Sequence, residues 1–203
     1  DLFYVNSHVF YRLKSEGRAV PVAQMENVEG HVTSRSQIFV RSDSGIETVE
    51  QLQGKRLAFI SPMGAGGYLA PRAYLRRMGV NTGEEVFTRN LSSSLHEVLL
   101  GDIDAGTMCG VNYRLMSRKL DTGELRVIGV SDEYPENLVA ARSDLAPGLV
   151  RQVATILLAM DDTPDGSEVL TAMHGMKIGR FRPYDPAVEA ITRKLIQQAQ
   201  VGH

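Results

Sequence analysis

Short runs of apolar, β-branched and aromatic residues alternate with longer stretches of helical periodicity over most of the chain. Runs of this length and composition predict β-strands. The predicted strands cover residues 2–5, 19–24, 37–41, 56–60, 85–88, 103–108, 125–130 and 137–141. Because helical patterns separate most of these strands, their order indicates an α/β fold.

Glycines mark where two of the predicted helices end. A helix over residues 48–52 stops at Gly54, and one over residues 68–78 stops at Gly79. Glycine is favoured just after a helix because it readily adopts the left-handed conformation found there.

Hydroxyl side chains mark two helix starts. Ser7 is predicted as the N-cap of a helix over residues 8–14, and one of the serines at 92–94 as the N-cap of a short helix that closes at Gly101. A side-chain oxygen at this position accepts a hydrogen bond from a backbone N–H of the first turn.

Beyond Asp144 the alternation gives way to consecutive helices. Pro147 fits a first helical turn, and an amphipathic stripe follows it. The stripe consists of Leu149, Val150, Val153, Ile156, Leu157 and Met160. Thr163 and Asp185 each precede a proline, in the order that begins a helix. The sequence therefore predicts a helical C-terminal region.

The composition is that of a globular protein with one large domain or two small lobes. Of its 203 residues, 43% are hydrophobic, and 22 basic and 24 acidic side chains give a net charge of -2. This balance disfavours nucleic acid and anionic membranes as partners, and no apolar run is long enough for membrane insertion. No cofactor is indicated. A single cysteine, Cys109, excludes an internal disulfide and a multi-thiolate metal site within the chain.

The most informative segment runs from Lys55 to Pro71, where an apolar strand leads into a glycine-rich loop that begins a helix. Glycines let a backbone approach a ligand closely, and the first N–H groups of a helix have no partner within it. Such a junction suits a small anion. Its spacing matches neither a dinucleotide fingerprint nor a P-loop. Similar junctions also occur in α/β proteins without any ligand.

Three segments carry a resemblance to a known family. The first is IFVRSDSGIETVEQLQGKRLAF at residues 38–59. The second is GGYLAP at residues 66–71, followed by GDIDAG at residues 101–106, and the third is MDDTPDGSEVL at residues 160–170. Together they resemble the phosphate/phosphonate-type periplasmic substrate-binding proteins of ABC transporters, the PhnD-like branch of the type II binding-protein fold.

The resemblance implies an α/β, two-lobed type II periplasmic binding protein fold with a ligand cleft between lobes that close over the ligand. The implied first lobe combines residues 1–38 and 142–203, and the second is residues 39–141, with crossings near residues 37–41 and 137–142. Family members have a strand–helix–strand region before the segment that the first residues resemble. An N-terminal portion of the first lobe is therefore expected to be absent from this chain.

The loop chemistry and the resemblance together give a set of candidate ligand-binding residues. They are Tyr4, Asn6 and Ser7 in the first lobe, and Ser61, Met63, Gly64, Ala65, Gly66, Gly67, Tyr68, Cys109, Asn112 and Tyr113 in the second. Asn6 and Ser7 can donate to an oxyanion or cap a helix. The tyrosines from the second lobe can line a cleft or belong to the core. Arg41, Arg72 and Arg89 are candidate charge partners for an anion.

Two places depart from the family pattern. Phosphonate binders carry Ser and Thr in the loop before Gly-Tyr, where this chain has residues 63–66, Met-Gly-Ala-Gly. The loss of these hydroxyls has three possible consequences: an altered affinity for phosphonate, recognition of the ligand by the backbone alone, or a different solute. The family's ligand-facing histidine would fall near Leu91, and His96, about a turn later, is expected at the surface or in helix packing.

Cys109 follows the strand over residues 103–108, at the end where open α/β sheets place ligands. It is equally consistent with a buried, small apolar residue. If it faced the cleft with Met63 and Met108, the site would be rich in sulfur. One subgroup of the family binds arsenite and works with a membrane sensor kinase, although a single thiolate is a poor site for a soft ion.

The sequence therefore predicts a periplasmic or extracytoplasmic binding protein that captures a small oxyanion of the phosphonate, phosphate or phosphite type for an ABC permease. The alternative is an arsenite or oxyanion sensor that partners a membrane sensor histidine kinase and uses Cys109. Catalysis is not expected, because Cys109 forms no nucleophile–base pair in sequence with His96 or His174.

Overall fold

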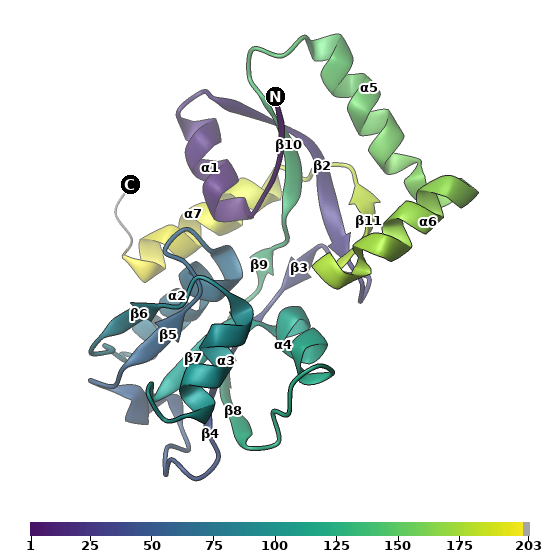
Figure 1. Cartoon of the computed structure of the whole chain (residues 1–203). Coiled ribbons are helices and arrows are strands. Elements are labelled where there is room, and N and C mark those ends of the chain that lie inside the picture. The colour runs from purple at the N-terminus through teal and green to yellow at the C-terminus, as the bar shows by residue number, and fades with distance from the viewer. Residues whose placement is uncertain (201–203) are drawn as a thin grey trace. The chain divides into compact units, whose positions relative to one another are not determined.

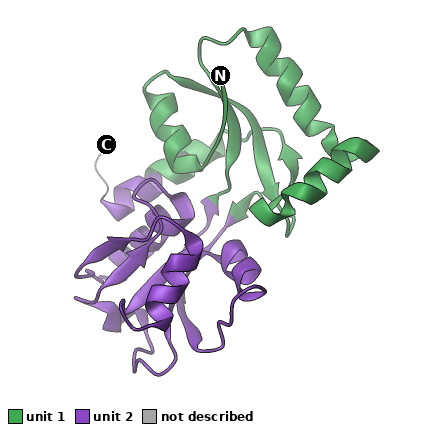
Figure 2. Ribbon diagram, in the orientation of Figure 1, with its two compact units in different colours: residues 1–33, 135–193, 203 green, residues 34–134, 194–202 purple. Residues whose placement is uncertain are grey.

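The computed structural model describes residues 1–200, which divide into two compact units (Figure 2). Unit 1 comprises Asp1–Thr33 and Pro135–Arg193, and unit 2 comprises Ser34–Tyr134 and residues 194–200. The chain passes from one to the other in β3 (Thr33–Ser34) and β9 (Tyr134–Pro135), two short strands that pair with each other. Each unit has its own sheet and its own hydrophobic clusters.

The division of the chain differs in detail from the predicted lobes. The expected crossings at residues 37–41 and 137–142 lie inside the two sheets, because strands there are hydrogen-bonded on both sides. Residues 194–200 group with unit 2, although the prediction assigned them to the first lobe. The end of that predicted lobe, residues 201–203, lies outside the described residues.

Unit 1 contains an antiparallel sheet of order β1-β10-β2-β11 (Figure 1). Its strands are β1 (Leu2–Val5), β10 (Leu138–Arg142), β2 (Ala19–Asn27) and β11 (Ile178–Arg182). In β2 the buried Ala23 and Met25 contribute to one cluster, with side chains from α5 and α6, whereas Ala19 contributes to another with Phe10 of α1. The sheet is therefore covered on both faces.

The helices of this unit are α1 (Ser7–Ser15), α5 (Pro147–Leu158), α6 (Pro164–Met173) and α7 (Ala187–Ala199), with 3-10 turns η3 (Met160–Asp162) and η4 (His174–Met176). Thr163 caps α6 by accepting from the Gly166 N–H at 3.2 Å, as its cap-then-proline pattern predicts. The last residues of α7 belong to unit 2.

One prediction for the C-terminal region is wrong, and a second holds only in part. The region is not purely helical, because β11 (Ile178–Arg182) pairs with β2. Its apolar signal is short, and its arginines are held by Glu26, whose Oε1 and Oε2 accept from Arg180 and Arg182 at 2.6 and 2.7 Å. The predicted stripe of α5 is also only partly packed: Leu157 contacts the core, whereas Ile156 is 67% exposed.

Both predicted N-caps are displaced toward the N-terminus. Asn6, not Ser7, caps α1, and its Oδ1 accepts from the N–H groups of His8 and Val9 at 3.0 and 3.1 Å. Asn90, not a residue at 92–94, caps the later helix. An asparagine is as good a cap as serine, so the preceding asparagine starts each helix earlier.

Unit 2 contains a mixed sheet of order β6-β5-β7-β4-β8. Its strands are β4 (Ser36–Arg41), β5 (Leu57–Phe59), β6 (Glu85–Phe87), β7 (Ala105–Cys109) and β8 (Leu125–Val130). β5 runs parallel to β6 and β7, whereas β4 is antiparallel to β7 and β8.

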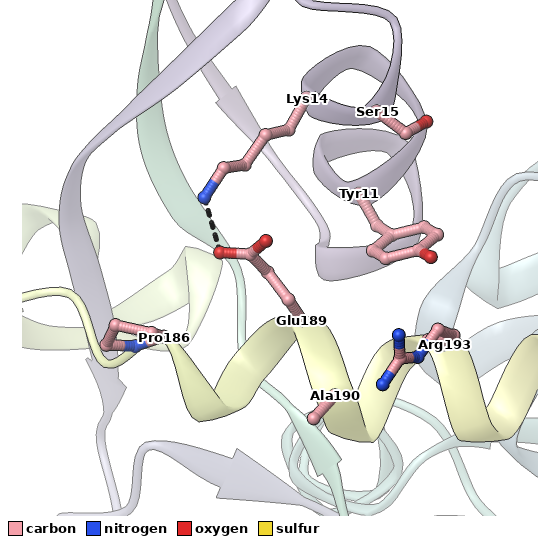
Figure 3. Close-up of a pocket in the computed structure, with 7 residues that line it drawn as sticks. All are labelled: Tyr11, Lys14, Ser15, Pro186, Glu189, Ala190 and Arg193. Atoms are coloured by element: carbon pink, nitrogen blue, oxygen red, sulfur yellow. Dashed lines mark hydrogen bonds and ion pairs between the residues drawn. The ribbon is translucent and has the colours of Figure 1, made fainter.

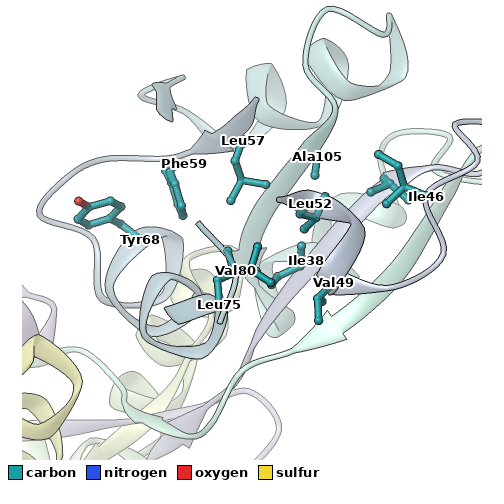
Figure 4. Packing of buried hydrophobic residues seen from close by; sticks show 11 residues of the cluster. Ile38, Ile46, Val49, Leu52, Leu57, Phe59, Tyr68, Leu75, Val80 and Ala105 are labelled. Carbon is teal, nitrogen blue, oxygen red and sulfur yellow. The ribbon is translucent and has the colours of Figure 1, made fainter. Parts of the chain in front are cut away.

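The helical elements of this unit are η1 (Val49–Leu52), a 3-10 helix, η2 (Ala65–Leu69), a π-helical turn, α2 (Ala70–Arg77), α3 (Leu91–Leu99) and α4 (Gly110–Ser117). Ile38 and Val40 of β4 enter the cluster drawn in Figure 4, whereas Phe39 between them enters a second cluster with Leu95 of α3. Because successive strand residues face opposite sides, the sheet is buried on both faces.

Candidate functional site

The glycine-rich loop follows β5 as predicted, and it enters the helix through the π-helical turn η2. Single π-helical turns are rare in proteins, and those that occur are often found at functional sites. Ser61 starts the loop: its Oγ accepts from the Met63 N–H at 3.3 Å, and its carbonyl accepts from the Gly64 N–H at 2.9 Å. The loop is thus folded by its own backbone before η2 begins.

Two buried hydroxyls hold the loop from the sheet. Ser36 Oγ on β4 donates to the Gly66 carbonyl at 2.6 Å. Thr107 Oγ1 on β7 lies 3.1 Å from the Gly67 carbonyl and 3.2 Å from the Ala58 carbonyl, which share its one proton. Both side chains belong to fully buried residues. Hydrogen bonds in such surroundings are shielded from competition by water, so they fix the two peptide planes.

The orientation of these planes decides where the loop donors point. Every described peptide bond is trans, so the N–H of a peptide unit points away from its carbonyl. The carbonyls of Gly66 and Gly67 point toward Ser36 and Thr107, and the N–H groups of Gly67 and Tyr68 therefore point away from those hydroxyls. Backbone N–H groups that point away from protein acceptors can bind an anion.

Close packing explains the glycines of this loop. A β-carbon on Gly66 would lie 2.0 Å from the hydroxyl oxygen of Tyr134, and one on Gly67 would lie 2.8 Å from the β-carbon of Ile60. Gly64 is less constrained, since its nearest neighbour would be the Ser61 carbonyl oxygen at 3.2 Å. Tyr134 is buried in unit 2.

The candidate tyrosines of unit 2, Tyr68 and Tyr113, pack in its hydrophobic clusters. Tyr68 is 8% exposed, with its ring centroid 5.0 Å from that of Phe59, and it belongs to the cluster of Figure 4. Tyr113 packs on Phe39 at 5.3 Å, and burial raises its pKa. Asn112, the neighbour of Tyr113 on α4, is half-buried.

Cys109 ends β7 and is 4% exposed. Its Sγ lies 3.6 Å from Ser34 Oγ, within the range of a weak sulfur hydrogen bond. Met108 points to the other face of the sheet and packs in the cluster with Phe39, while Met63 is half-buried in the loop. The sulfur-rich grouping of Met63, Met108 and Cys109 is therefore not formed, because the strand alternation separates Met108 from Cys109.

In unit 1 the candidates Tyr4, Asn6 and Ser7 lie around the start of α1. Tyr4 Oη lies 2.8 Å from the sulfur of Met25, and Ser7 Oγ donates to the Pro135 carbonyl at 3.2 Å. Asn6 uses its side-chain oxygen as the cap. His8, which sequence analysis did not single out, is buried, and burial followed by the charge of Arg12 lowers its pKa.

Three arginines were candidate charge partners, and two are engaged elsewhere. Arg41 donates to both carboxylate oxygens of Asp43 at 2.6 and 3.0 Å. Arg72 pairs with Glu85 and donates to the Ala199 carbonyl at 2.9 Å. Arg89 is exposed and lies two residues beyond the end of β6.

A separate groove of about 450 Å³ lies in unit 1 between α1 and α7 (Figure 3). Its lining includes Tyr11, Lys14, Glu189 and Arg193. Lys14 and Glu189 form an ion pair there, and Tyr184 donates to Glu189 at 2.9 Å. These charges already compensate one another, which is typical of a structural contact between helices.

Sequence reasoning missed the residues that hold the loop: Ser36, Thr107 and Tyr134. A hydroxyl within an otherwise apolar, buried strand was the available signal for the first two. Nothing in the sequence showed that Tyr134 would meet Gly66, because the two residues are far apart along the chain.

Within residues 1–200, no cluster of three or more His, Cys, Asp or Glu side chains has the arrangement of a metal site. None of the helices in that same range combines the length and apolar character needed to cross a bilayer.

Two α/β units, one of which carries a glycine-rich loop, are an architecture typical of small-ligand binding proteins. Residues 1–188 match the family described as ABC transporter, phosphonate, periplasmic substrate-binding protein. The chain belongs to this family, which confirms the family indicated by the three segments of the sequence.

Solved structures show the same fold. A Xanthomonas citri protein bound to ATP is 21% identical, with a TM-score of 0.85 over 98% of this chain and 78% of that one. The PhnD protein of Prochlorococcus marinus in complex with methylphosphonate is 15% identical, with a TM-score of 0.79 over 98% and 78%. A binding protein of a Pseudomonas aeruginosa ABC phosphonate transporter is 16% identical, with a TM-score of 0.82 over 98% and 68%.

The chain therefore has the type II periplasmic binding protein fold. Its family is periplasmic, binds small molecules, works with ABC permeases and is not enzymatic.

Proposed function

We propose that this protein captures a small tetrahedral oxyanion of the phosphonate, phosphate or phosphite type and presents it to an ABC permease. The observation that carries the proposal is the loop of residues 61–68. Its carbonyls at Gly66 and Gly67 are engaged by Ser36 and Thr107. Its N–H groups at Gly67 and Tyr68 are thereby directed away from the sheet.

Recognition would depend on the backbone more than on loop side chains. Residues 63–67 read Met-Gly-Ala-Gly-Gly and carry no hydroxyl or charged group, so Ser61 is the side-chain donor of the loop. Donors that are already oriented cost little reorganisation when an anion binds. This supports an oxyanion ligand despite the missing Ser and Thr side chains.

Unit 1 has a set of candidate ligand-binding groups of its own at the start of α1. The His8 and Val9 N–H groups already donate to Asn6 Oδ1, so the side-chain amide N–H groups of Asn6 and the helix dipole are what this turn offers an anion. We assign Tyr4 and Asn6 to this set. Ser7 is a structural member of it, because its hydroxyl is used by the Pro135 carbonyl.

The proposal is tested by isothermal titration of the protein with methylphosphonate, phosphate, phosphite and sulfate. We expect binding of at least one phosphorus oxyanion, weakened several-fold in Ser61→Ala, which loses a single hydrogen bond. Ser44→Ala is the matched control, because the Oγ of the exposed Ser44 likewise accepts from a backbone N–H two residues on, that of Ile46 at 3.3 Å. Absence of heat with all four anions would contradict the proposal.

Isothermal titration also distinguishes the proposed function from thiol-dependent arsenite sensing. Cys109 is buried against Ser34, and a single thiol satisfies a soft ion poorly. We therefore expect Cys109→Ala to retain oxyanion binding. Arsenite binding that disappears in Cys109→Ala would favour the sensor and its kinase partner instead.

A further inference from the structure

A cationic residue is connected directly to the backbone of the glycine loop. The Arg89 N–H donates to the Ile60 carbonyl with an N···O distance of 2.9 Å. The Ile60 N–H in turn donates to the Gly67 carbonyl at 3.2 Å. Ile60 is thus the one residue between the backbone of Arg89 and the loop, and Ser61 follows it.

The backbone at Arg89 has an uncommon conformation. Its φ is 64°, in the left-handed region that non-glycine residues rarely occupy. The conformation is held on both sides: the Thr88 N–H donates to the Phe59 carbonyl at 2.9 Å, and Asn90 caps α3 by accepting from the Ser93 N–H at 2.8 Å. Strained residues of this kind concentrate at functional sites. Glycine or asparagine would adopt the conformation more readily, so the arginine side chain at this position is a candidate for a functional role.

The position of Arg89 fits that use. β5 and β6 are parallel, and Arg89 lies just beyond their carboxyl ends, where open α/β sheets bind ligands. The loop of residues 61–68 has no charged side chain of its own. Within residues 1–200 no carboxylate forms an ion pair with Arg89, whereas Arg41 and Arg72 are paired.

We infer that Arg89 supplies the positive charge of the oxyanion site. This inference rests on the proposed function and extends it. The planar guanidinium makes charge-assisted, bidentate hydrogen bonds to two oxygens of a tetrahedral anion that the loop N–H groups hold. The ligand class that matches is a phosphorus oxyanion carrying at least one negative charge.

Two substitutions separate charge from backbone conformation. Arg89→Gln removes the charge and keeps a long polar side chain. Arg89→Gly removes the charge and also relieves the backbone strain of a positive φ. Titration with methylphosphonate and phosphate should show a loss of affinity of about tenfold or more in both variants. The melting temperature of ligand-free Arg89→Gly should rise, because glycine adopts this conformation without strain.

Arg118→Gln is the matched control. Arg118 is an exposed residue at the C-cap of α4 in the same unit, so its replacement makes the same change in net charge. Its affinity should equal that of the wild type. Wild-type affinity in both Arg89 variants, or an equal loss in Arg118→Gln, would overturn the inference and leave the proposed function intact. No binding of either anion by the wild type would contradict both.

Discussion

The hydroxyl oxygen of Tyr134 lies 2.0 Å from the position that a β-carbon on Gly66 would occupy. No side chain fits at residue 66 unless the loop or the buried tyrosine moves. We expect Gly66→Ala to destabilise the protein by about 1–3 kcal/mol, the usual cost of overpacking, and to weaken anion binding by displacing the loop. Urea denaturation and titration with methylphosphonate measure the two effects.

Gly64→Ala is the control for this prediction. Its β-carbon would meet the Ser61 carbonyl oxygen at 3.2 Å, and φ at Gly64 is -77°, which any residue adopts. A small change in stability is expected. Equal behaviour of the two alanine variants would contradict the steric role assigned to Tyr134.

A buried ion pair joins Lys177 and Glu136 in unit 1, and Asn27 Nδ2 donates to the second Glu136 oxygen at 3.0 Å. Lys177→Met should cost about 3–5 kcal/mol, because it leaves a buried carboxylate without its cation. The double variant Lys177→Met with Glu136→Gln should recover part of that loss. Urea denaturation of the wild type and the variants forms the test; a double variant less stable than Lys177→Met would contradict it.

The N-cap of α1 is assigned to Asn6, whose Oδ1 accepts from two backbone N–H groups. Asn6→Ala should therefore lower the free energy of unfolding by about 1 kcal/mol, whereas Asn6→Asp should retain the cap. Ser15→Ala, an exposed change at the other end of the helix, serves as the control. Chemical denaturation decides between them, and an unaffected Asn6→Ala would show that the cap contributes nothing.

His8 should make stability depend on pH. Burial and then the charge of Arg12 lower its pKa in the folded state, so the unfolded chain binds a proton first as pH falls. Its effect on the free energy of unfolding is absent above about pH 6.5 and grows as a destabilisation below it. Urea denaturation at a series of pH values below about 6.5 measures the free energy of unfolding. Its dependence on pH should be weaker in His8→Phe than in the wild type. An unchanged slope would assign the dependence to other groups.

Local signals in the sequence were sufficient for most of the secondary structure. Runs such as residues 37–41 and 125–130 are apolar and β-branched, and they became β4 and β8. Gly54 and Gly79, predicted as helix stops, have φ values of 72° and 76°. A strand that is buried on both faces is apolar throughout, whichever strands it pairs with, so the pattern can be read from the sequence alone.

Weaker elements needed their partners. β11 has two arginines among its few residues, and it is a strand because β2 offers both a hydrogen-bonding edge and Glu26 for those side chains. The N-caps were misassigned by a few residues because serine and asparagine compete for the same role, and local sequence does not rank them.

The sequence by itself determined the α/β class, the family and the position of the donor loop, because apolar periodicity and glycine spacing are properties of neighbouring residues. Only the tertiary structure decided which side chains surround that loop. Ser36, Thr107 and Tyr134 reach it from three strands, and Arg89 reaches its backbone through Ile60. Those contacts depend on strand order and on the face each residue takes in the sheet, and both are set by packing between distant segments.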